Sequence, residues 1–116
     1  MNISVIIPTR NRARLLAGVL DALEAQTRPP DELIVVDNGS TDATPGLLAE
    51  RRGRLSAMRV VREPAPGLHR GRHRGWQAAR GDVLAFGDDD AEPEPGWLAA
   101  MAAAFEDGRT ALAGGR

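Results

Sequence analysis

The sequence predicts an α/β fold in which one parallel sheet lies between layers of helices. Four short apolar runs recur along the chain, and such runs are typical of strands buried on both faces. Segments with helical periodicity separate these runs, and strands that alternate with helices form parallel sheets with right-handed crossovers. The length of 116 residues suits one domain with a single core.

The first half of the chain contains two strands and two helices. Residues 3–7 form the first predicted strand, which Pro8 ends. Leucine and valine residues spaced along 15–23 form the apolar face of a helix. Residues 33–36 form the second strand. Thr44 is the expected N-cap of the next helix, because a proline follows it at the first helical position.

The second half continues the same alternation. Residues 58–61 form a third strand, and 67–75 form a loop rich in glycine and arginine that leads into a short helix. Residues 83–86 form a fourth strand, 97–105 form an alanine-rich helix, and 111–113 begin a fifth strand. Ligands of such sheets bind at the carboxyl ends of the strands, so the polar residues that follow each strand are the candidate site.

Composition excludes several classes of protein. The formal net charge is −1, so no overall field attracts nucleic acid or an anionic membrane, although nine arginines and one acid lie between Arg51 and Arg80. The chain has no cysteine, no signal peptide and no apolar run near the roughly 20 residues of a membrane span. We therefore expect a cytoplasmic location, with contact at the inner face of the membrane only through other regions.

Three adjacent aspartates, Asp88, Asp89 and Asp90, follow the fourth predicted strand. Two like charges about 4 Å apart repel by roughly 4 kcal/mol at an effective dielectric constant near 20, and a divalent cation would remove that penalty. Carboxylate oxygens are hard ligands that favour Mg²⁺ or Mn²⁺ over Zn²⁺. A solvated acidic loop is the alternative interpretation of this triplet.

Other polar groups have two interpretations or more. Asp37 at the end of the second strand could accept hydrogen bonds from a ribose or a base, or could serve only as a turn residue. Arg70, Arg72 and Arg74 could contact a diphosphate, lie on a solvated loop, or bind RNA. RNA is disfavoured because the arginine segment lacks interleaved aromatic residues. No Gly-x-Gly-x-x-Gly follows the first strand, which disfavours a dinucleotide-binding domain.

Taken in order, four motifs resemble family 2 glycosyltransferases with the GT-A fold. They are Val-Ile-Ile-Pro-Thr-Arg-Asn-Arg from residue 5, Pro-Asp-Glu-Leu-Ile-Val-Val-Asp-Asn-Gly-Ser-Thr-Asp from residue 30, Arg-His-Arg-Gly from residue 72 and Gly-Asp-Val-Leu-Ala-Phe-Gly-Asp-Asp-Asp from residue 81. The resemblance covers nearly the whole chain. It implies a Rossmann-like α/β/α sandwich of GT-A type, truncated after about five strands, with residues 1–116 forming a single nucleotide-diphospho-sugar-binding domain that is incomplete at its C-terminus.

The resemblance also implies a site. It places a nucleoside diphosphate sugar, first of all a UDP-sugar, against residues of all four motifs, with Mn²⁺ or Mg²⁺ as cofactor and an unidentified acceptor. Asp37 would accept a hydrogen bond from the base, Arg72 would lie near the base and the diphosphate, and the metal would be held by Asp88 and Asp90. The implied nucleotide-sugar-binding residues are Pro8, Thr9, Arg10, Asn11, Asp37, Arg72, Asp88 and Asp89.

The chain departs from the family pattern at two positions and lacks one implied group. His73 stands where asparagine is usual, and Gly87 stands where an apolar residue is usual. In this family the general base comes from a carboxylate well beyond the D-x-D motif, so the resemblance implies inverting transfer but assigns no base here. The alternative is a non-catalytic module that binds a nucleotide sugar or depends on a partner.

Overall fold

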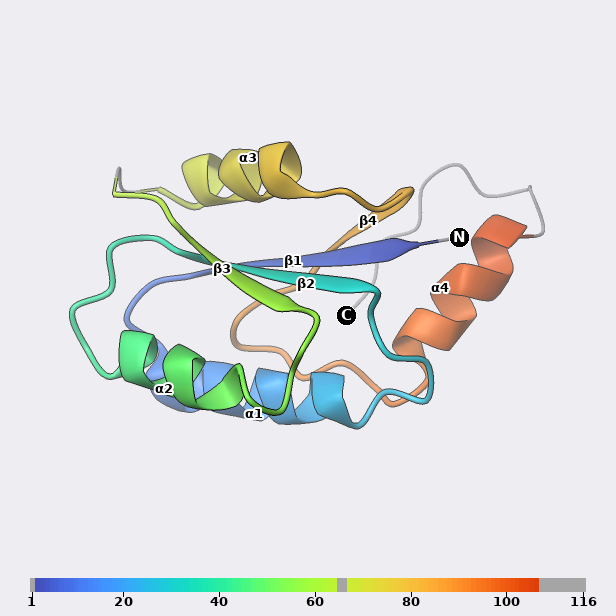
Figure 1. Cartoon of the computed structure of the whole chain (residues 1–116), viewed down its shortest axis with the longest axis horizontal. Coiled ribbons are helices and arrows are strands. Elements are labelled where there is room, and N and C mark those ends of the chain that lie inside the picture. The colour runs from blue at the N-terminus through green and yellow to red at the C-terminus, as the bar shows by residue number, and fades with distance from the viewer. Residues whose placement is uncertain (1, 65–66, 107–116) are drawn as a thin grey trace.

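The structure is a computed structural model that describes residues 2–64 and 67–106. It confirms the predicted α/β class: strands and helices alternate along the chain, and helices cover both faces of one sheet (Figure 1). The expected fifth strand at 111–113 lies outside the described residues. The strands are β1 (Ile3–Thr9), β2 (Glu32–Asp37), β3 (Met58–Arg62) and β4 (Val83–Phe86), and the helices are α1 (Ala13–Glu24), α2 (Thr44–Arg51), α3 (Leu68–Ala78) and α4 (Trp97–Glu106).

The four strands form a parallel sheet in the order β3-β2-β1-β4. β1 is longer than predicted, since Pro8 lies within the strand and pairs in register with Val36 of β2. A proline is tolerated at this central position because the pairing of β1 with β4 ends at Ile6, so none of the described strands lies on that side of Pro8. The carboxyl end of β1 is therefore open toward the end of β4.

One face of the sheet packs against α1, α2 and α4 and holds the larger core. Strand residues on this face alternate with residues on the other face, as expected for strands covered on both sides. Figure 1 shows α1 and α2 side by side below the sheet. The buried residues of this core include Ile3, Val5, Ile7, Leu16, Val19, Leu20, Leu23, Leu33, Val35, Leu48, Val83, Ala85, Leu98 and Met101.

The other face packs against α3 and buries a smaller cluster of Ile6, Ile34 and Val36. The segment predicted as a loop at 67–75 is helical from Leu68 onward, so that prediction was wrong. The glycines are present because the helix lies close to the sheet. A Cβ atom at Gly75 would lie 2.3 Å from Ile6 Cγ2. The glycines that suggested a loop are the residues that let a helix contact the strands.

Helix α2 begins at Thr44, one residue earlier than a Thr44 N-cap would require, and Pro45 lies in its first turn. The helix has no side-chain cap at its N-cap position. Asp42 takes that role, since its Oδ1 accepts a hydrogen bond of 2.9 Å from the backbone N–H of Thr44. Its other oxygen accepts from the N–H of Ala13 at 3.2 Å, so one carboxylate satisfies the first turns of two helices.

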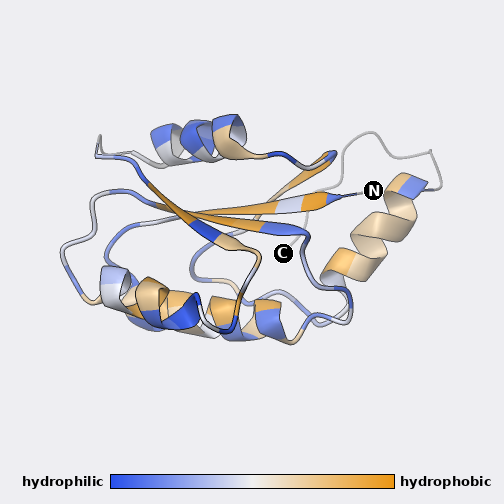
Figure 2. Ribbon diagram, in the orientation of Figure 1, coloured by the Kyte–Doolittle hydropathy of each residue, from blue (hydrophilic) through white to orange (hydrophobic). Residues whose placement is uncertain are grey.

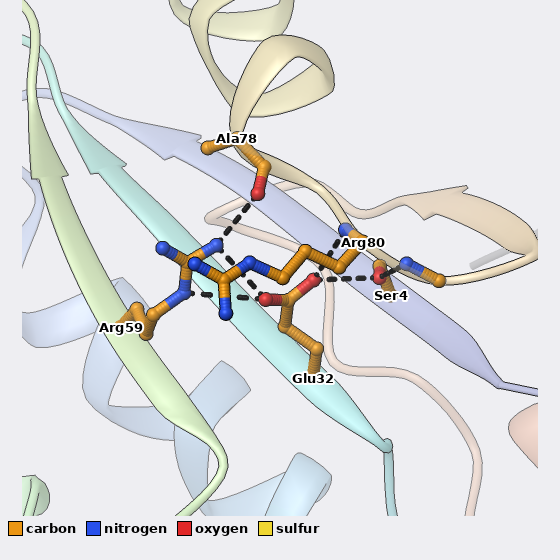
Figure 3. A network of polar contacts seen from close by, with 6 residues as sticks. Ser4, Glu32, Arg59, Ala78 and Arg80 are labelled. Atoms are coloured by element: carbon orange, nitrogen blue, oxygen red, sulfur yellow. Dashed lines mark hydrogen bonds and ion pairs between the residues drawn. The ribbon is translucent and has the colours of Figure 1, made fainter.

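A polar network closes the amino-terminal edge of the sheet (Figure 3). Glu32 Oε1 accepts hydrogen bonds from Ser4 Oγ at 2.8 Å and from the backbone N–H of Arg80 at 2.9 Å. Its Oε2 accepts from Arg59 Nε and Nη2, and Nη2 also donates to the carbonyl of Ala78 at 2.6 Å. One carboxylate therefore joins β1, β2 and β3 to the segment that follows α3.

This network makes the stability of the protein depend on pH. Burial raises the pKa of Glu32, but the hydrogen bonds from Arg80, Ser4 and Arg59 outweigh it, so the pKa is lower than its ordinary value. A lowered carboxyl pKa stabilises the fold above the unfolded-state pKa of about 4.3, and that contribution is lost as pH falls through the folded-state pKa.

We expect Glu32→Gln to lower the free energy of unfolding at neutral pH by about 1 to 2 kcal/mol. Both carboxylate oxygens of Glu32 accept hydrogen bonds, and the NH₂ group of glutamine would replace one of these acceptors with a donor. Urea unfolding monitored by circular dichroism at several pH values is the measurement. The difference between the two proteins should shrink as the pH is lowered below about 4.3. A difference that stays constant down to acid pH would show that the charge of Glu32 is not what stabilises the network.

In the described part of the chain, no helix combines the length and the apolar content that crossing a bilayer requires.

Candidate functional site

A cleft of about 620 Å³ lies at the carboxyl edge of the sheet, a volume within the range of small-molecule sites. Its walls come from the turns after β1, β2 and β4 and from the start of α3. The lining residues are Pro8, Thr9, Arg10, Arg12, Asn38, Gly67, Arg72, Gly87, Asp88, Asp89 and Asp90. Seven of the nine residues predicted for the site are in this set, and Asn11 and Asp37 are not.

The crossover connection explains how Arg72 reaches the cleft. In a parallel sheet the chain leaves each strand at the carboxyl edge, so the helix that follows β3 begins at that edge. Arg72 lies in the first half of α3, on the flank that faces the cleft. The helical conformation, in place of the predicted loop, is what brings Arg72 to the cleft.

The three aspartates do not have equivalent surroundings. The Asp89 side chain is 13% exposed, and its Oδ2 accepts a hydrogen bond of 3.0 Å from Thr9 Oγ1. Asp88 and Asp90 are exposed. The middle residue thus holds the loop against β1, and the first and last carboxylates are exposed at the cleft.

Arg12, which the sequence reasoning missed, lies among these carboxylates. Its Nη1 is 3.0 Å from Asp90 Oδ2 and 3.3 Å from Asp89 Oδ1. The Arg12 and Asp90 side chains are each 48% exposed, and exposed ion pairs contribute at most about 1 kcal/mol. The pair neutralises part of the repulsion between the aspartates and is weak enough to open for a ligand. Its position just after the Pro-Thr-Arg-Asn turn was the only sequence signal for it.

The donor set suits a divalent cation that is shared with a phosphate ligand. In residues 2–64 and 67–106 no group of three or more histidine, cysteine or acidic side chains is arranged to hold a metal by itself. Mg²⁺ commonly uses one or two carboxylates and completes its coordination with water and substrate phosphates. The exposed oxygens of Asp88 and Asp90 fit that arrangement.

Asn11 does not line the cleft but stabilises the turns that form it. Its φ of 53° lies in the left-handed region, which asparagine adopts more readily than most residues. Its Oδ1 accepts hydrogen bonds from the N–H groups of Thr41 at 2.7 Å and Asp42 at 3.3 Å, and its own N–H donates to Ser40 Oγ. Asn11 therefore joins the turn after β1 to the loop after β2 and supports the cleft.

Asp37 and Asn38 point in opposite directions because side chains alternate along a strand. Asp37 is 2% exposed, and its Oδ1 accepts a hydrogen bond of 3.0 Å from the N–H of Ser40, so it stabilises the turn. Asn38 is on the α3 side and lines the cleft, and its Nδ2 donates to the carbonyl of Gly67 at 2.8 Å. The Oδ1 of Asn38 has no hydrogen-bond partner among the described residues.

The cleft also holds cations without acidic partners. Arg10 and Arg72 are exposed, and neither makes an ion pair within the part of the chain that the structure describes. Guanidinium groups bind phosphate oxygens through paired N–H donors. The site therefore combines two free guanidinium groups, two exposed carboxylates and an amide, which together suit a ligand with a diphosphate and a polar ring.

Comparison with known families agrees with this geometry. The family model described as glycosyl transferase family 2 matches residues 4–116. The chain belongs to glycosyl transferase family 2. The match includes every residue that lines the cleft and all of the four described strands except Ile3, so the family assignment covers the whole of the described site.

Relatives within glycosyl transferase family 2 are longer than this chain. Glycosyltransferase AglE of Haloferax volcanii is 33% identical over 99 residues, which are 83% of this chain and 33% of that protein. A PGL/p-HBAD biosynthesis glycosyltransferase of Mycobacterium bovis is 37% identical over 102 residues, which are 86% of this chain and 40% of that protein. The matched part of the chain thus spans between 33% and 40% of the length of these relatives.

Two solved structures of similar chains carry nucleotide sugars. S. aureus TarS 1–349 in complex with UDP-GlcNAc superposes with a TM-score of 0.81 at 29% identity, over 92% of this chain and 32% of that one. The mannosyltransferase PcManGT from Pyrobaculum calidifontis, in complex with GDP-Man and Mn²⁺, gives 0.78 at 33% identity, over 87% and 31%. These likenesses confirm the GT-A type of fold.

Proposed function

We propose that this chain is the donor-binding region of an inverting glycosyltransferase and that its cleft binds a nucleoside diphosphate sugar together with Mn²⁺ or Mg²⁺. The observation that carries the proposal is the meeting of exposed Asp88 and Asp90 with the free guanidinium groups of Arg10 and Arg72 in one cleft at the carboxyl edge. The similar structures with UDP-GlcNAc and with GDP-Man and Mn²⁺ support it.

Each group has a role in this proposal. Arg10 and Arg72 bind the diphosphate oxygens, because a guanidinium group offers two parallel donors to a phosphate. Asn38 faces the base, and its partnerless carbonyl oxygen is an acceptor for a ring N–H, a role that the sequence had suggested for Asp37. Asp37 supports that wall through its hydrogen bond to Ser40.

Asp88 and Asp90 would hold the metal, which when bound stabilises the negative charge of the departing nucleoside diphosphate. Arg12 Nη1 lies 3.0 Å from Asp90 Oδ2 and so places a positive charge beside the proposed metal ligand. With a cation on Asp90, Arg12 would keep its 3.3 Å contact with Asp89 and could turn its other N–H groups toward a phosphate oxygen. Asp89 stays on Thr9 throughout and keeps the loop in position.

Titration calorimetry with UDP and with GDP tests the proposal. We expect binding in the presence of Mn²⁺ and a loss of most of the affinity in EDTA, because the aspartates repel a diphosphate unless a cation lies between them. Equal affinity with and without the metal would contradict the metal assignment. Absence of binding to any nucleoside diphosphate would contradict the donor site.

Two variants distinguish the role of the base-facing residue. Asn38→Ala should weaken nucleoside diphosphate binding and leave pyrophosphate binding unchanged, since Asn38 lines the cleft but carries no charge for the phosphates. Asp37→Ala should mainly lower the melting temperature, because it removes the oxygen that accepts the hydrogen bond from the N–H of Ser40. If the Asp37 variant instead lost nucleoside diphosphate binding and the Asn38 variant kept it, Asp37 would be the residue that contacts the base.

A further inference from the structure

A second groove, of about 640 Å³, lies on the flank of α3 away from the donor cleft. β3 contributes its last residue and the residue after it, and α3 contributes four side chains from two successive turns. The residues that form it include Arg62, Glu63, Arg70, His73, Arg74 and Gln77. None of them lines the donor cleft, so the groove is a separate feature of the molecule.

The contact between α3 and the sheet fixes which side chains reach the groove. Gly71 and Gly75 face the strands, since a Cβ atom at Gly71 would lie 3.0 Å from Pro8 Cβ and one at Gly75 would lie 2.3 Å from Ile6 Cγ2. Residues four apart share one side of a helix, so Arg70 and Arg74 project from the same flank. Figure 2 shows α3 largely hydrophilic above strands that are largely hydrophobic.

The arginines of the groove lack the acidic partners that Arg51 and Arg59 have. Arg51 Nη1 lies 2.6 Å from Asp21 Oδ1, and Arg59 Nη2 lies 2.9 Å from Glu32 Oε2. Within residues 2–64 and 67–106, no ion pair involves Arg62, Arg70 or Arg74. Like charges one helical turn apart destabilise a helix, so the cluster has a cost that a bound anion would offset.

The charge of the groove indicates which anion it fits. Three guanidinium groups and the carboxylate of Glu63 leave two net positive charges. The end of β3 is held in place, because the N–H of Glu63 donates to the carbonyl of Asp37 at 3.0 Å. Guanidinium groups recognise phosphate oxygens through paired donors, and Gln77 adds an amide donor from the same helix.

We propose that this groove is a second anion site that binds a phosphate-bearing ligand independently of the donor cleft. A phosphate monoester carries close to two negative charges at neutral pH, which matches the net charge of the groove. The phosphate can belong to a small soluble molecule or to the headgroup of a lipid. The two sources share the chemistry that Arg62, Arg70 and Arg74 recognise.

Nuclear magnetic resonance of the ¹⁵N-labelled chain titrated with inorganic phosphate in EDTA tests the site directly. The side-chain Nε–Hε resonances of Arg62, Arg70 and Arg74 should shift together and saturate. The double variant Arg70→Gln with Arg74→Gln should bind phosphate about tenfold or more weakly, since it removes two sets of charge-assisted hydrogen bonds.

The matched control is the double variant Arg14→Gln with Arg52→Gln, which removes the same charge from exposed arginines that line neither cavity. It should bind phosphate like the unmodified chain. Absence of a shift at the three groove arginines would contradict the site. Equal weakening in the control would also contradict it, since it would show that phosphate responds only to the net charge of the protein. Because each resonance reports one residue, the result does not depend on whether the donor cleft binds its nucleotide.

Sedimentation with vesicles identifies the source of the phosphate. Vesicles of phosphatidylcholine with phosphatidic acid are compared with vesicles of phosphatidylcholine alone. Capture by phosphatidic acid that is lost in the Arg70 and Arg74 variant and kept in the Arg14 and Arg52 control assigns the groove to a lipid headgroup. Saturable phosphate shifts without such capture assign it to a soluble phosphate compound, and failure of both readouts rejects the proposal.

Discussion

Replacing Asp90 by asparagine is expected to weaken Mn²⁺-dependent binding of a nucleoside diphosphate by more than about 100-fold. Loss of groups that merely orient metal ligands costs about 10- to 100-fold in metal affinity, and loss of a ligand should cost more. The asparagine side chain is about the size of the aspartate that it replaces and could still face Arg12, so the fold should be unaffected. Calorimetry with UDP and Mn²⁺ is the measurement.

Glu92→Gln is the matched control, because Glu92 is an exposed carboxylate two residues further along the same loop and does not line the cleft. Its nucleotide affinity should equal that of the unmodified chain. In EDTA the Asp90 variant should bind UDP at least as well as the unmodified chain, since it has one fewer negative charge beside the diphosphate. Equal Mn²⁺-dependent affinity in the Asp90 and Glu92 variants would remove Asp90 from the proposed site.

The strands and the edge that carries the site could be predicted because both follow from local patterns. Short apolar runs marked all four described strands, and the rule that ligands bind at the carboxyl ends of parallel strands selected the turns after them. Asp89 and Thr9 are distant in sequence, and this rule was sufficient to bring them to one cleft. The strands and the turns of the site were predicted correctly because each is marked by residues within a single element.

The remaining features depend on contacts between elements, which the sequence alone did not reveal. Gly71 and Gly75 have low helix propensity, and only the approach of Pro8 and Ile6 explains why a helix contains them. Arg12 was missed because its partners lie 77 and 78 residues away. The sequence could not distinguish Asp37 from Asn38, because the preceding residues of β2 are buried on both faces of the sheet and do not show which of two consecutive side chains faces α3.

Replacing Gly75 by alanine is expected to lower the free energy of unfolding, although alanine is the better helix former. The added Cβ would lie 2.3 Å from Ile6 Cγ2 and 3.2 Å from Val36 Cγ2. Both strand residues are fully buried, and β-branched side chains have little freedom to move aside. Overpacking of this kind costs about 1 to 3 kcal/mol.

Gly46→Ala is the matched comparison and should have the opposite sign. Gly46 lies in α2, and a Cβ atom there would meet nothing within 4 Å. The substitution should stabilise the protein by up to about 1 kcal/mol through helix propensity alone. Urea unfolding of both variants checks the pair. If Gly75→Ala stabilised the protein as Gly46→Ala does, α3 would have to lie further from β1 than the structure places it, and the placement of Arg72 in the donor cleft would fail with it.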